Sequence, residues 1–287
     1  MANGPLPDEY DLIGPWSEVK LEVLREYAKP YSQIMKSKGL HHLYIDGFAG
    51  PGFHVSKTTG EVIKGSPLNA LATQPPFEEY HFIDRDPART QQIRDHARSF
   101  FSEANVSVYA GDCNEVLMRD VFPRAVYADY KRALCVLDPY NIDLSWDVVY
   151  RAGQMKSVEI FLNFMVMDMN MNVLLNDRAK ADPKQVARMD KFWGDRSWHE
   201  VTYEESAQAS LFGDREVVKV ENSNDRIAEA YRQRLLEVAG FQYVPEPLKF
   251  PNRLGRTVYY LFFASPNATG KKILEATFNK YRGKNWF

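Results

Sequence analysis

Four aspartates stand at or near the ends of apolar runs in this chain, and side chains of this type can bind a nucleotide-like ligand. They are Asp46, Asp84, Asp112 and Asp138. A carboxylate accepts hydrogen bonds only, so it suits ribose hydroxyls, amino groups and amines. The first aspartate opens Asp46–Gly52, a segment that predicts a strand running into a glycine-rich turn. The order of the four aspartates therefore suggests a ligand site divided among several strand ends.

The glycine-rich turn indicates which ligand. Phe48, Gly50 and Gly52 follow Asp46 at alternate positions, and glycine lets a ligand approach the backbone closely. Dinucleotide sites usually read Gly-x-Gly-x-x-Gly, so the spelling Asp-x-Phe-x-Gly-x-Gly favours S-adenosylmethionine. We expect Asp46 and the backbone amides after it to hold the amino-acid end of this cofactor. The alternative is a turn that only connects a strand to a helix.

The next two aspartates fit the remaining parts of the cofactor. Asp84 ends a predicted strand, and a carboxylate there can accept hydrogen bonds from the ribose hydroxyls. Asp86 is expected to cap the following helix, although both residues could be caps only. Asp112 is placed to accept a hydrogen bond from the adenine amino group, and Cys113 would supply a backbone amide nearby. A Gly-Asp pair alone is an ordinary turn, so this assignment depends on its order along the chain.

The fourth aspartate belongs to a segment that could act on the methyl acceptor. Asp138-Pro139-Tyr140 ends the fourth predicted strand. Amino-methyltransferases of nucleobases carry Asp/Asn-Pro-Pro-Tyr/Phe here, and this chain is one proline short. The acid and the proline carbonyl would accept the amine hydrogens, and the ring would stack on the base. An acid and a proline that merely end a strand are the alternative. Asp143 and Trp146 could line the same pocket, although a core position is favoured for Trp146.

Other kinds of site are less well supported. The six histidines and two cysteines form no recognisable Ser-His-Asp, Cys-His or metal-ligand pattern, so we expect no metal. Cys113 and Cys135 suggest buried free thiols in a reducing cytoplasm. With 36 basic and 38 acidic residues, the chain is not a globally basic nucleic-acid binder. Several basic residues near the carboxyl end are expected on a solvated face, with a phosphate track as the alternative: Arg253, Arg256, Lys271, Lys272, Lys280, Arg282 and Lys284.

Strands alternate with helices along most of the chain, which predicts a Rossmann-like α/β fold with a mostly parallel, seven-stranded sheet and helices on both faces. Apolar residues at helical spacing predict a helix over Trp16–Lys36, capped by Ser17 and stopped by Gly39. Further helices are expected at Pro87–Phe101 and from Ser66-Pro67. The expected strands are His42–Phe48, Tyr80–Asp84, Val106–Ala110, Ala133–Asp138 and Ser157–Phe164.

Near its carboxyl end the chain departs from this alternation. Gly240–Pro247 and Arg256–Ala264 are separated by too few residues for a helix, so they predict an antiparallel hairpin that closes the sheet. Five parallel strands followed by a hairpin are the layout of class I methyltransferases. We expect one domain over residues 1–287, with a helical cover at 1–40. Residues 165–222 are expected to form a helical insertion, either a lid or substrate platform or a packing subdomain.

The whole pattern resembles the three-Cys-motif partner proteins, a bacterial and phage-associated family with a methyltransferase-like fold. The resemblance covers nearly the whole chain, through these segments: Trp16–Tyr31, Tyr44–Gly52, Gly65–Leu71, Leu137–Tyr140 with Trp146, Val258–Ala264 and Gly270–Ile273. It implies S-adenosylmethionine as cofactor and a partner that carries a three-cysteine motif and resembles radical-S-adenosylmethionine proteins. That motif is not in this chain, so any iron–sulfur chemistry would belong to the partner.

Two functions follow as hypotheses. The first is an S-adenosylmethionine-dependent methyltransferase acting on an amine, such as a nucleobase in DNA or RNA. The second is an accessory subunit that binds the cofactor, or keeps its pocket, without transferring methyl groups. The sequence offers no signal peptide and no run of about 18 apolar residues, so a cytoplasmic protein without a membrane span is expected.

Overall fold

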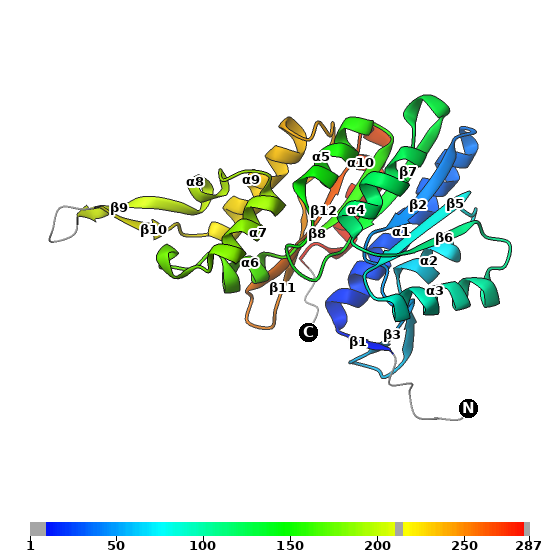
Figure 1. Ribbon diagram of the computed structural model, residues 1–287, viewed down its shortest axis with the longest axis horizontal. Coiled ribbons are helices and arrows are strands. Elements are labelled where there is room, and N and C mark those ends of the chain that lie inside the picture. The colour runs from blue at the N-terminus through cyan, green and yellow to red at the C-terminus, as the bar shows by residue number, and fades with distance from the viewer. Residues whose placement is uncertain (1–9, 210–214, 284–287) are drawn as a thin grey trace. The chain divides into compact units, whose positions relative to one another are not determined.

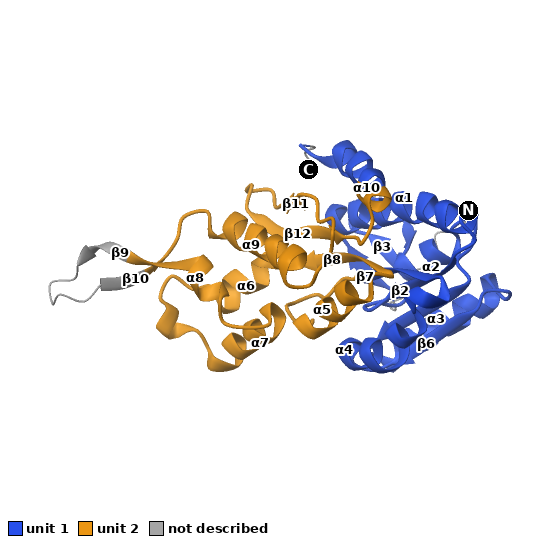
Figure 2. Ribbon diagram, turned by 90° about the horizontal axis from the view of Figure 1, so that it is seen from above, with its two compact units in different colours: residues 1–136, 272–287 blue, residues 137–271 orange. Residues whose placement is uncertain are grey.

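The computed structural model describes residues 10–209 and 215–283, and the chain divides into two compact units. Unit 1 comprises residues 1–136 and 272–287, and unit 2 comprises residues 137–271 (Figure 2). The chain alternates strands and helices through most of its length, as Figure 1 shows. This alternation is the one that the sequence predicted.

Seven strands form the main sheet, in the order β11-β12-β8-β7-β2-β5-β6. The pairs β2–β5, β2–β7 and β5–β6 are parallel, whereas β12 is antiparallel to both β8 and β11. This mixed sheet confirms the Rossmann-like, class I methyltransferase-like fold. The strands are β2 (His41–Asp46), β5 (Glu79–Asp84), β6 (Val106–Ala110), β7 (Lys131–Leu137), β8 (Val158–Phe164), β11 (Leu248–Pro251) and β12 (Thr257–Ala264).

Unit 1 buries the apolar faces of its helices against the sheet. In α1 (Pro15–Ser37), residues such as Leu24, Tyr27 and Tyr31 are buried at the spacing of one helix face. Helices α1 and α2 (Ser66–Leu71) both pack on β2, and α3 (Pro87–Phe100) packs on β5 and β6. The chain then passes through α4 (Cys113–Val116), η1 (Leu117–Val121), η2 (Phe122–Arg124) and η3 (Tyr127–Asp129), while α10 (Ala268–Tyr281) comes near the carboxyl end.

The predicted helix caps are partly correct. Asp86 caps α3 by accepting a hydrogen bond from the amide of Ala88 at 2.8 Å. The caps predicted at Ser17 and Ser66 are wrong, because Gly14 and Gly65 occupy those positions. In both helices a proline lies in the first turn, where its missing N–H costs no helical hydrogen bond, so the helix begins earlier than the serine suggests.

A small second sheet occupies the segment between the glycine-rich turn and α2. Its order is β1-β3-β4, formed by β1 (Asp11–Ile13), β3 (Phe53–Ser56) and β4 (Val62–Lys64). Strand β3 pairs in parallel with β1 and antiparallel with β4. The segment that separates the glycine-rich turn from α2 therefore contains a β-hairpin, formed by β3 and β4.

Unit 2 contains helices and a second hairpin. Its helices are α5 (Trp146–Met155), α6 (Val166–Asn172), α7 (Pro183–Trp193), α8 (Trp198–Thr202) and α9 (Ser223–Glu237), with a short turn η4 (Arg178–Lys180). Strands β9 (Tyr203–Ala209) and β10 (Arg215–Lys219) pair antiparallel and extend away from these helices in Figure 1. Residues 165–222 thus contain strands as well as the predicted helices, and their role as lid or platform stays a prediction.

The closing hairpin of the main sheet is present, but its first strand begins later than predicted. Strand β11 covers Leu248–Pro251, whereas the predicted Gly240–Pro247 contributes only one bridge, between Tyr243 and Ser265. Pro245 and Pro247 lack the N–H that a strand in a ladder donates. The regular pairing with β12 therefore starts only after the second proline.

An aromatic core holds unit 2 together. Tyr231 is fully buried and stacks on Phe192 at a centroid distance of 5.3 Å, and it also contacts Phe164 at 4.9 Å. Trp146 meets Tyr231 edge-on at 5.5 Å, and its ring lies under the guanidinium of Arg234. The prediction that Trp146 is a core residue is thus confirmed. Such aromatic pairs add about 1 kcal/mol each beyond their buried area.

Candidate functional site

The glycine-rich turn follows β2 and is tied to the neighbouring strands of unit 1 by backbone hydrogen bonds. The amide of Gly47 donates to the carbonyl of Val136 at 2.9 Å, and the amide of Ala49 donates to that of Ile83 at 2.9 Å. Gly50 and Gly52 have φ angles of +64° and +92°, a region that side chains rarely adopt. These two glycines are therefore required by the backbone of the turn itself.

Asp46 is the last residue of β2 and immediately precedes this turn. It is completely buried, and its Oδ1 accepts a hydrogen bond from the amide of Phe48 at 3.2 Å. The thiols of Cys113 and Cys135 have raised pKa values, chiefly because they are buried and in part because of the negative charge of Asp46. Both thiols stay protonated at neutral pH. The carboxylate of Asp46 thus helps to hold the conformation of the turn, and its direct contact with a cofactor stays a prediction.

Asp84 connects the end of β5 to the glycine-rich turn. Its Oδ2 accepts a hydrogen bond from the amide of Gly50 at 2.9 Å, and its Oδ1 accepts one from the amide of Asp86 at 2.8 Å. An ionised carboxylate has about four lone-pair positions, so two acceptor positions remain for ribose hydroxyls. The structure therefore brings two of the predicted cofactor residues, Asp84 and Gly50, into direct contact.

Asp112 lies after β6 and caps α4. Its Oδ1 accepts a hydrogen bond from the amide of Asn114 at 2.8 Å, and its Oδ2 pairs with Arg85 at 2.6 Å. Partial burial raises the pKa of Asp112, but the hydrogen bonds from Arg85 and Asn114 outweigh this effect, so the pKa is lowered overall. Asp112 is thus ionised at neutral pH. Cys113 occupies the first position of α4, where a backbone N–H has no acceptor within the helix.

The predicted cofactor residues of unit 1 end or follow strands that are paired in the main sheet. Strand β5 pairs in parallel with both β2 and β6, so the segments after these three strands leave the same edge of the sheet. A Cβ atom added at Gly65 would lie 2.9 Å from Nε2 of His54 and 3.0 Å from the carbonyl oxygen of Gly52. The residues after the turn therefore pack closely against it. Together these features leave polar backbone and carboxylate groups for the amino-acid end, the ribose and the adenine.

Unit 2 holds the predicted acceptor residues at its first loop. Tyr140 is 68% exposed, as a ring that stacks on a base would need to be, whereas Pro139 is buried. The side-chain amide of Asn163 donates from Nδ2 to Asp138 Oδ1 at 2.8 Å. The same nitrogen lies 3.5 Å from the carbonyl oxygen of Pro139. The two predicted hydrogen-bond acceptors are therefore held by one side chain.

Asp168 holds the rest of this loop. It is buried, accepts a hydrogen bond from the amide of Ile142 at 3.0 Å, and pairs with Arg188. Arg188 also lies 3.6 Å from Asp143. Asp143, suggested by the sequence as a pocket residue, is thus engaged with the arginine of α7. This network fixes the course of the loop after Asp138.

The sequence prediction missed Asn163, Asp168, Arg188 and Tyr259. Tyr259 is buried, and its pKa is raised chiefly by burial and also by the charge of Asp138. One signal was available for Asn163, since a single amide within the apolar run Ile160–Phe164 indicates a buried polar group that needs partners. The other three residues are far from Asp138 in the chain, and no local pattern connects them to it.

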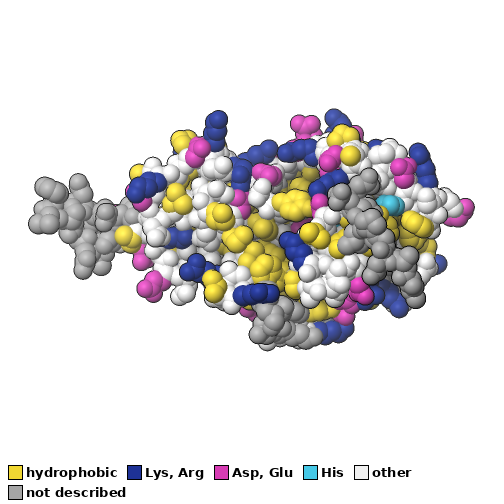
Figure 3. All heavy atoms as spheres, turned by 90° about the horizontal axis from the view of Figure 1, so that it is seen from below, with side chains coloured by type: hydrophobic (Ala, Val, Ile, Leu, Met, Phe, Trp, Pro, Cys, Tyr) yellow, Lys and Arg dark blue, Asp and Glu magenta, His cyan; other side chains and the backbone are white. Residues whose placement is uncertain are grey.

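The remaining predictions concern charge, metals and membranes. On the face drawn in Figure 3, basic and acidic side chains occur side by side, in agreement with the nearly balanced composition. Among the described residues, no group of three or more His, Cys, Asp or Glu could hold a metal ion. The described helices include none that is both long and apolar enough to cross a membrane. Lys284, one of the predicted solvated cations, lies outside the described residues.

Comparison with solved structures gives weak similarities over most of the chain. Protein LPL1258 of Legionella pneumophila, of family DUF519, has a TM-score of 0.49 and 11% identity, covering 89% of this chain and 90% of its own. An S-adenosylmethionine-dependent methyltransferase of Clostridium acetobutylicum has a TM-score of 0.39 and 10% identity, covering 84% and 92%. No protein-family model matches the sequence, and no curated protein matches it significantly. The fold assignment therefore depends on strand order and register.

Proposed function

We propose that this chain binds S-adenosylmethionine in unit 1 and transfers its methyl group to an amine, such as a nucleobase in DNA or RNA. One observation supports the cofactor above all others. The carboxylate of Asp84 accepts a hydrogen bond from the amide of Gly50, a contact that would hold a ribose-binding acid against the glycine-rich turn.

Each part of the proposed cofactor site has its own role. The backbone amides after Asp46 would bind the carboxylate of the amino-acid end, and Asp84 would bind the ribose hydroxyls with its remaining acceptor positions. Asp112 would accept a hydrogen bond from the adenine amino group, while the amide of Cys113 would donate one to a ring nitrogen. S-adenosylmethionine supplies an electrophilic methyl group on a sulfonium. The protein contributes binding and orientation rather than a covalent intermediate.

The acceptor would be oriented by unit 2. Asp138 and the carbonyl of Pro139 would accept hydrogen bonds from the amine, which directs the nitrogen lone pair toward the methyl carbon. Tyr140 would stack on a planar acceptor with its exposed ring. The amine would lose a proton as it gains the methyl group, and Asp138 or water would accept that proton. Rate acceleration would come mainly from positioning.

A second candidate is an accessory subunit that binds the cofactor without transferring methyl groups. It is favoured by Asn163, whose Nδ2 already donates to Asp138 and lies close to the Pro139 carbonyl. An amine would have to share both acceptors with this amide. The resemblance to three-Cys-motif partner proteins suggests that such a subunit would act together with a radical-S-adenosylmethionine-like protein.

Transfer of tritiated methyl groups distinguishes the two candidates. The purified chain is incubated with labelled cofactor and with total DNA, RNA or protein, with and without the candidate partner. Label in one of these fractions that depends on Asp138 supports the methyltransferase. If the chain binds the cofactor but labels no fraction in either condition, the accessory role is supported instead. Failure to bind the cofactor at all would contradict both candidates.

A further inference from the structure

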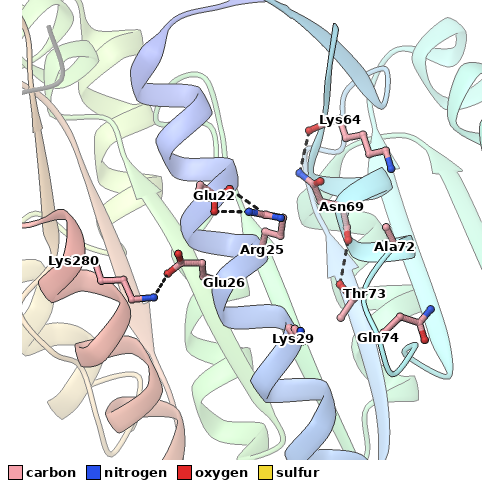
Figure 4. Close-up of a pocket in the computed structure, with 10 residues that line it drawn as sticks. All are labelled: Glu22, Arg25, Glu26, Lys29, Lys64, Asn69, Ala72, Thr73, Gln74 and Lys280. Atoms are coloured by element: carbon pink, nitrogen blue, oxygen red, sulfur yellow. Dashed lines mark hydrogen bonds and ion pairs between the residues drawn. The ribbon is translucent and has the colours of Figure 1, made fainter. Parts of the chain in front are cut away.

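One cavity in unit 1 is lined by none of the predicted cofactor residues. It has a volume of about 680 Å³ and lies between α1 and α2, with further residues from β4 and α10 (Figure 4). Small-molecule sites typically have volumes of about 300–1,000 Å³. The cavity is therefore large enough for a ligand of its own.

The lining carries more positive than negative charge. It includes four cations and two carboxylates, in a chain whose formal net charge is −2. Arg25 donates from Nε to Glu22 at 3.0 Å, and Lys280 donates to Glu26 at 2.9 Å. These two pairs neutralise both carboxylates (Figure 4). The cavity is thus locally basic on a slightly acidic protein.

Two lysines account for the excess charge. Lys29 on α1 and Lys64 at the end of β4 are exposed, and neither ammonium group makes an ion pair with any residue in the described part of the chain. They come from different elements and line one cavity. Two lysines on an ordinary solvated surface need not line the same cavity.

We propose that this cavity binds a small molecule carrying a di- or triphosphate group. Lysine is a compact point charge that suits phosphate oxygens, and two lysines match two phosphates. The side-chain amides of Asn69 and Gln74 add polar groups to the lining, which contains no aromatic residue for stacking a base. The formal net charge of −2 on the whole chain disfavours a continuous nucleic-acid track over a small phosphate ligand.

Calorimetric titration with inorganic pyrophosphate and tripolyphosphate tests this proposal, because both probes carry the phosphate groups alone. We expect binding that the variant Lys29→Gln/Lys64→Gln weakens by about tenfold or more, since two charge contacts are lost. The control Lys38→Gln/Lys57→Gln removes two exposed lysines outside the cavity and should leave the affinity unchanged. Citrate serves as a polyanion without phosphorus, and it should bind more weakly.

Several results would overturn the proposal. No heat of binding at millimolar pyrophosphate, from protein with an intact thermal transition, would exclude a phosphate site. Equal losses in the two double variants would show an effect of net charge alone, and citrate binding as tightly as tripolyphosphate would exclude selectivity for phosphate. Duplex DNA or RNA that depends on Lys29 and Lys64 and competes out tripolyphosphate would assign the cavity to a nucleic-acid backbone.

Discussion

The carboxylates of unit 1 and the acceptor loop of unit 2 are held in different ways. Asp84 and Asp112 bind backbone amides, either of their own turn or of the glycine-rich turn. Asp138 is instead held by the side chain of Asn163, which is 25 residues away in the chain. Backbone amides thus hold Asp84 and Oδ1 of Asp112, whereas a side-chain amide holds Oδ1 of Asp138. The two halves should therefore respond differently to mutation.

The largest expected effect is the loss of methyl transfer in Asp138→Ala. Removing the carboxylate that orients the amine should lower the rate about 100-fold or more, as for other acid–base groups. The affinity for S-adenosylmethionine should stay within about twofold, because binding is assigned to unit 1. Initial rates with labelled cofactor measure the first effect, and calorimetry measures the second.

Asp147→Asn is a suitable control for Asp138→Ala. Asp147 is an exposed acid in the first turn of α5, so its loss removes a similar charge without touching the Asp138 loop. Both quantities should be unchanged in this control. A transfer rate that is the same in Asp138→Ala as in the wild type would remove Asp138 from the acceptor site.

Asp84→Ala should affect the other half. It removes the acceptor for the Gly50 amide and the proposed ribose contact, so the affinity for S-adenosylmethionine should fall about 30-fold. Asp86→Ala is the matched control, because it removes the α3 cap and a 3.9 Å ion pair with Arg89 but no proposed ribose contact, and it should cost about 1 kcal/mol of stability. Equal affinities of the two variants would show that Asp84 is only a turn residue.

Glu79 allows a test at a distance from both predicted sites. It begins β5, and its side chain lies 2.8 Å from His41 and 3.1 Å from Arg124. Burial raises the pKa of Glu79, but hydrogen bonds from His41 and Arg124 outweigh it and lower the pKa to about 2. The ionised form is thus favoured in the folded state. Its contribution to stability is present above about pH 4.5 and is lost as the pH falls toward 2.

Glu79→Gln should therefore flatten the acid dependence of unfolding and lower the stability at pH 7. We expect a loss on the order of 1–2 kcal/mol, measured by urea denaturation from pH 7 down to pH 3. The affinity for S-adenosylmethionine at pH 7 should not change. An unchanged slope below pH 4.5 would show that this cluster does not stabilise the fold.

The smallest expected effect separates backbone strain from ligand contact. Gly50→Ala and Gly60→Ala both place a side chain at positive φ, +64° and +73°, with no atom closer than 3.8 Å to the added carbon. Each should lose about 1 kcal/mol of stability. Only Gly50→Ala should also weaken S-adenosylmethionine binding, by about fivefold, because the amide of Gly50 is held by Asp84. Equal affinities would place the cofactor away from the turn.

The sequence predicted the parts of the fold that local patterns determine. Strand β6 has the predicted bounds, Val106–Ala110, and Asp86 caps α3 as expected, because its carboxylate accepts a hydrogen bond from the amide of Ala88 in the first turn. The β3–β4 and β9–β10 hairpins were not predicted, since their segments lack a long apolar alternation. The shift of β11 came from two prolines whose effect on the ladder depends on the partner strand.

The candidate site divides in the same way. The contact of Asp84 with the glycine-rich turn agrees with the predicted order of strand ends, because parallel strands bring their ends to one edge. The contact of Asn163 with Asp138 depends on where β8 lies relative to the loop, and no spacing along the chain specifies that. A sequence can therefore suggest the acceptor motif without revealing what holds it.

The most direct test of the central claim is calorimetric titration of the intact chain with S-adenosylmethionine, together with Asp84→Ala. The account predicts binding at one site in the wild type and a much weaker affinity in the variant. No binding by a wild-type sample with a cooperative thermal transition would contradict the cofactor site, whatever the acceptor loop does.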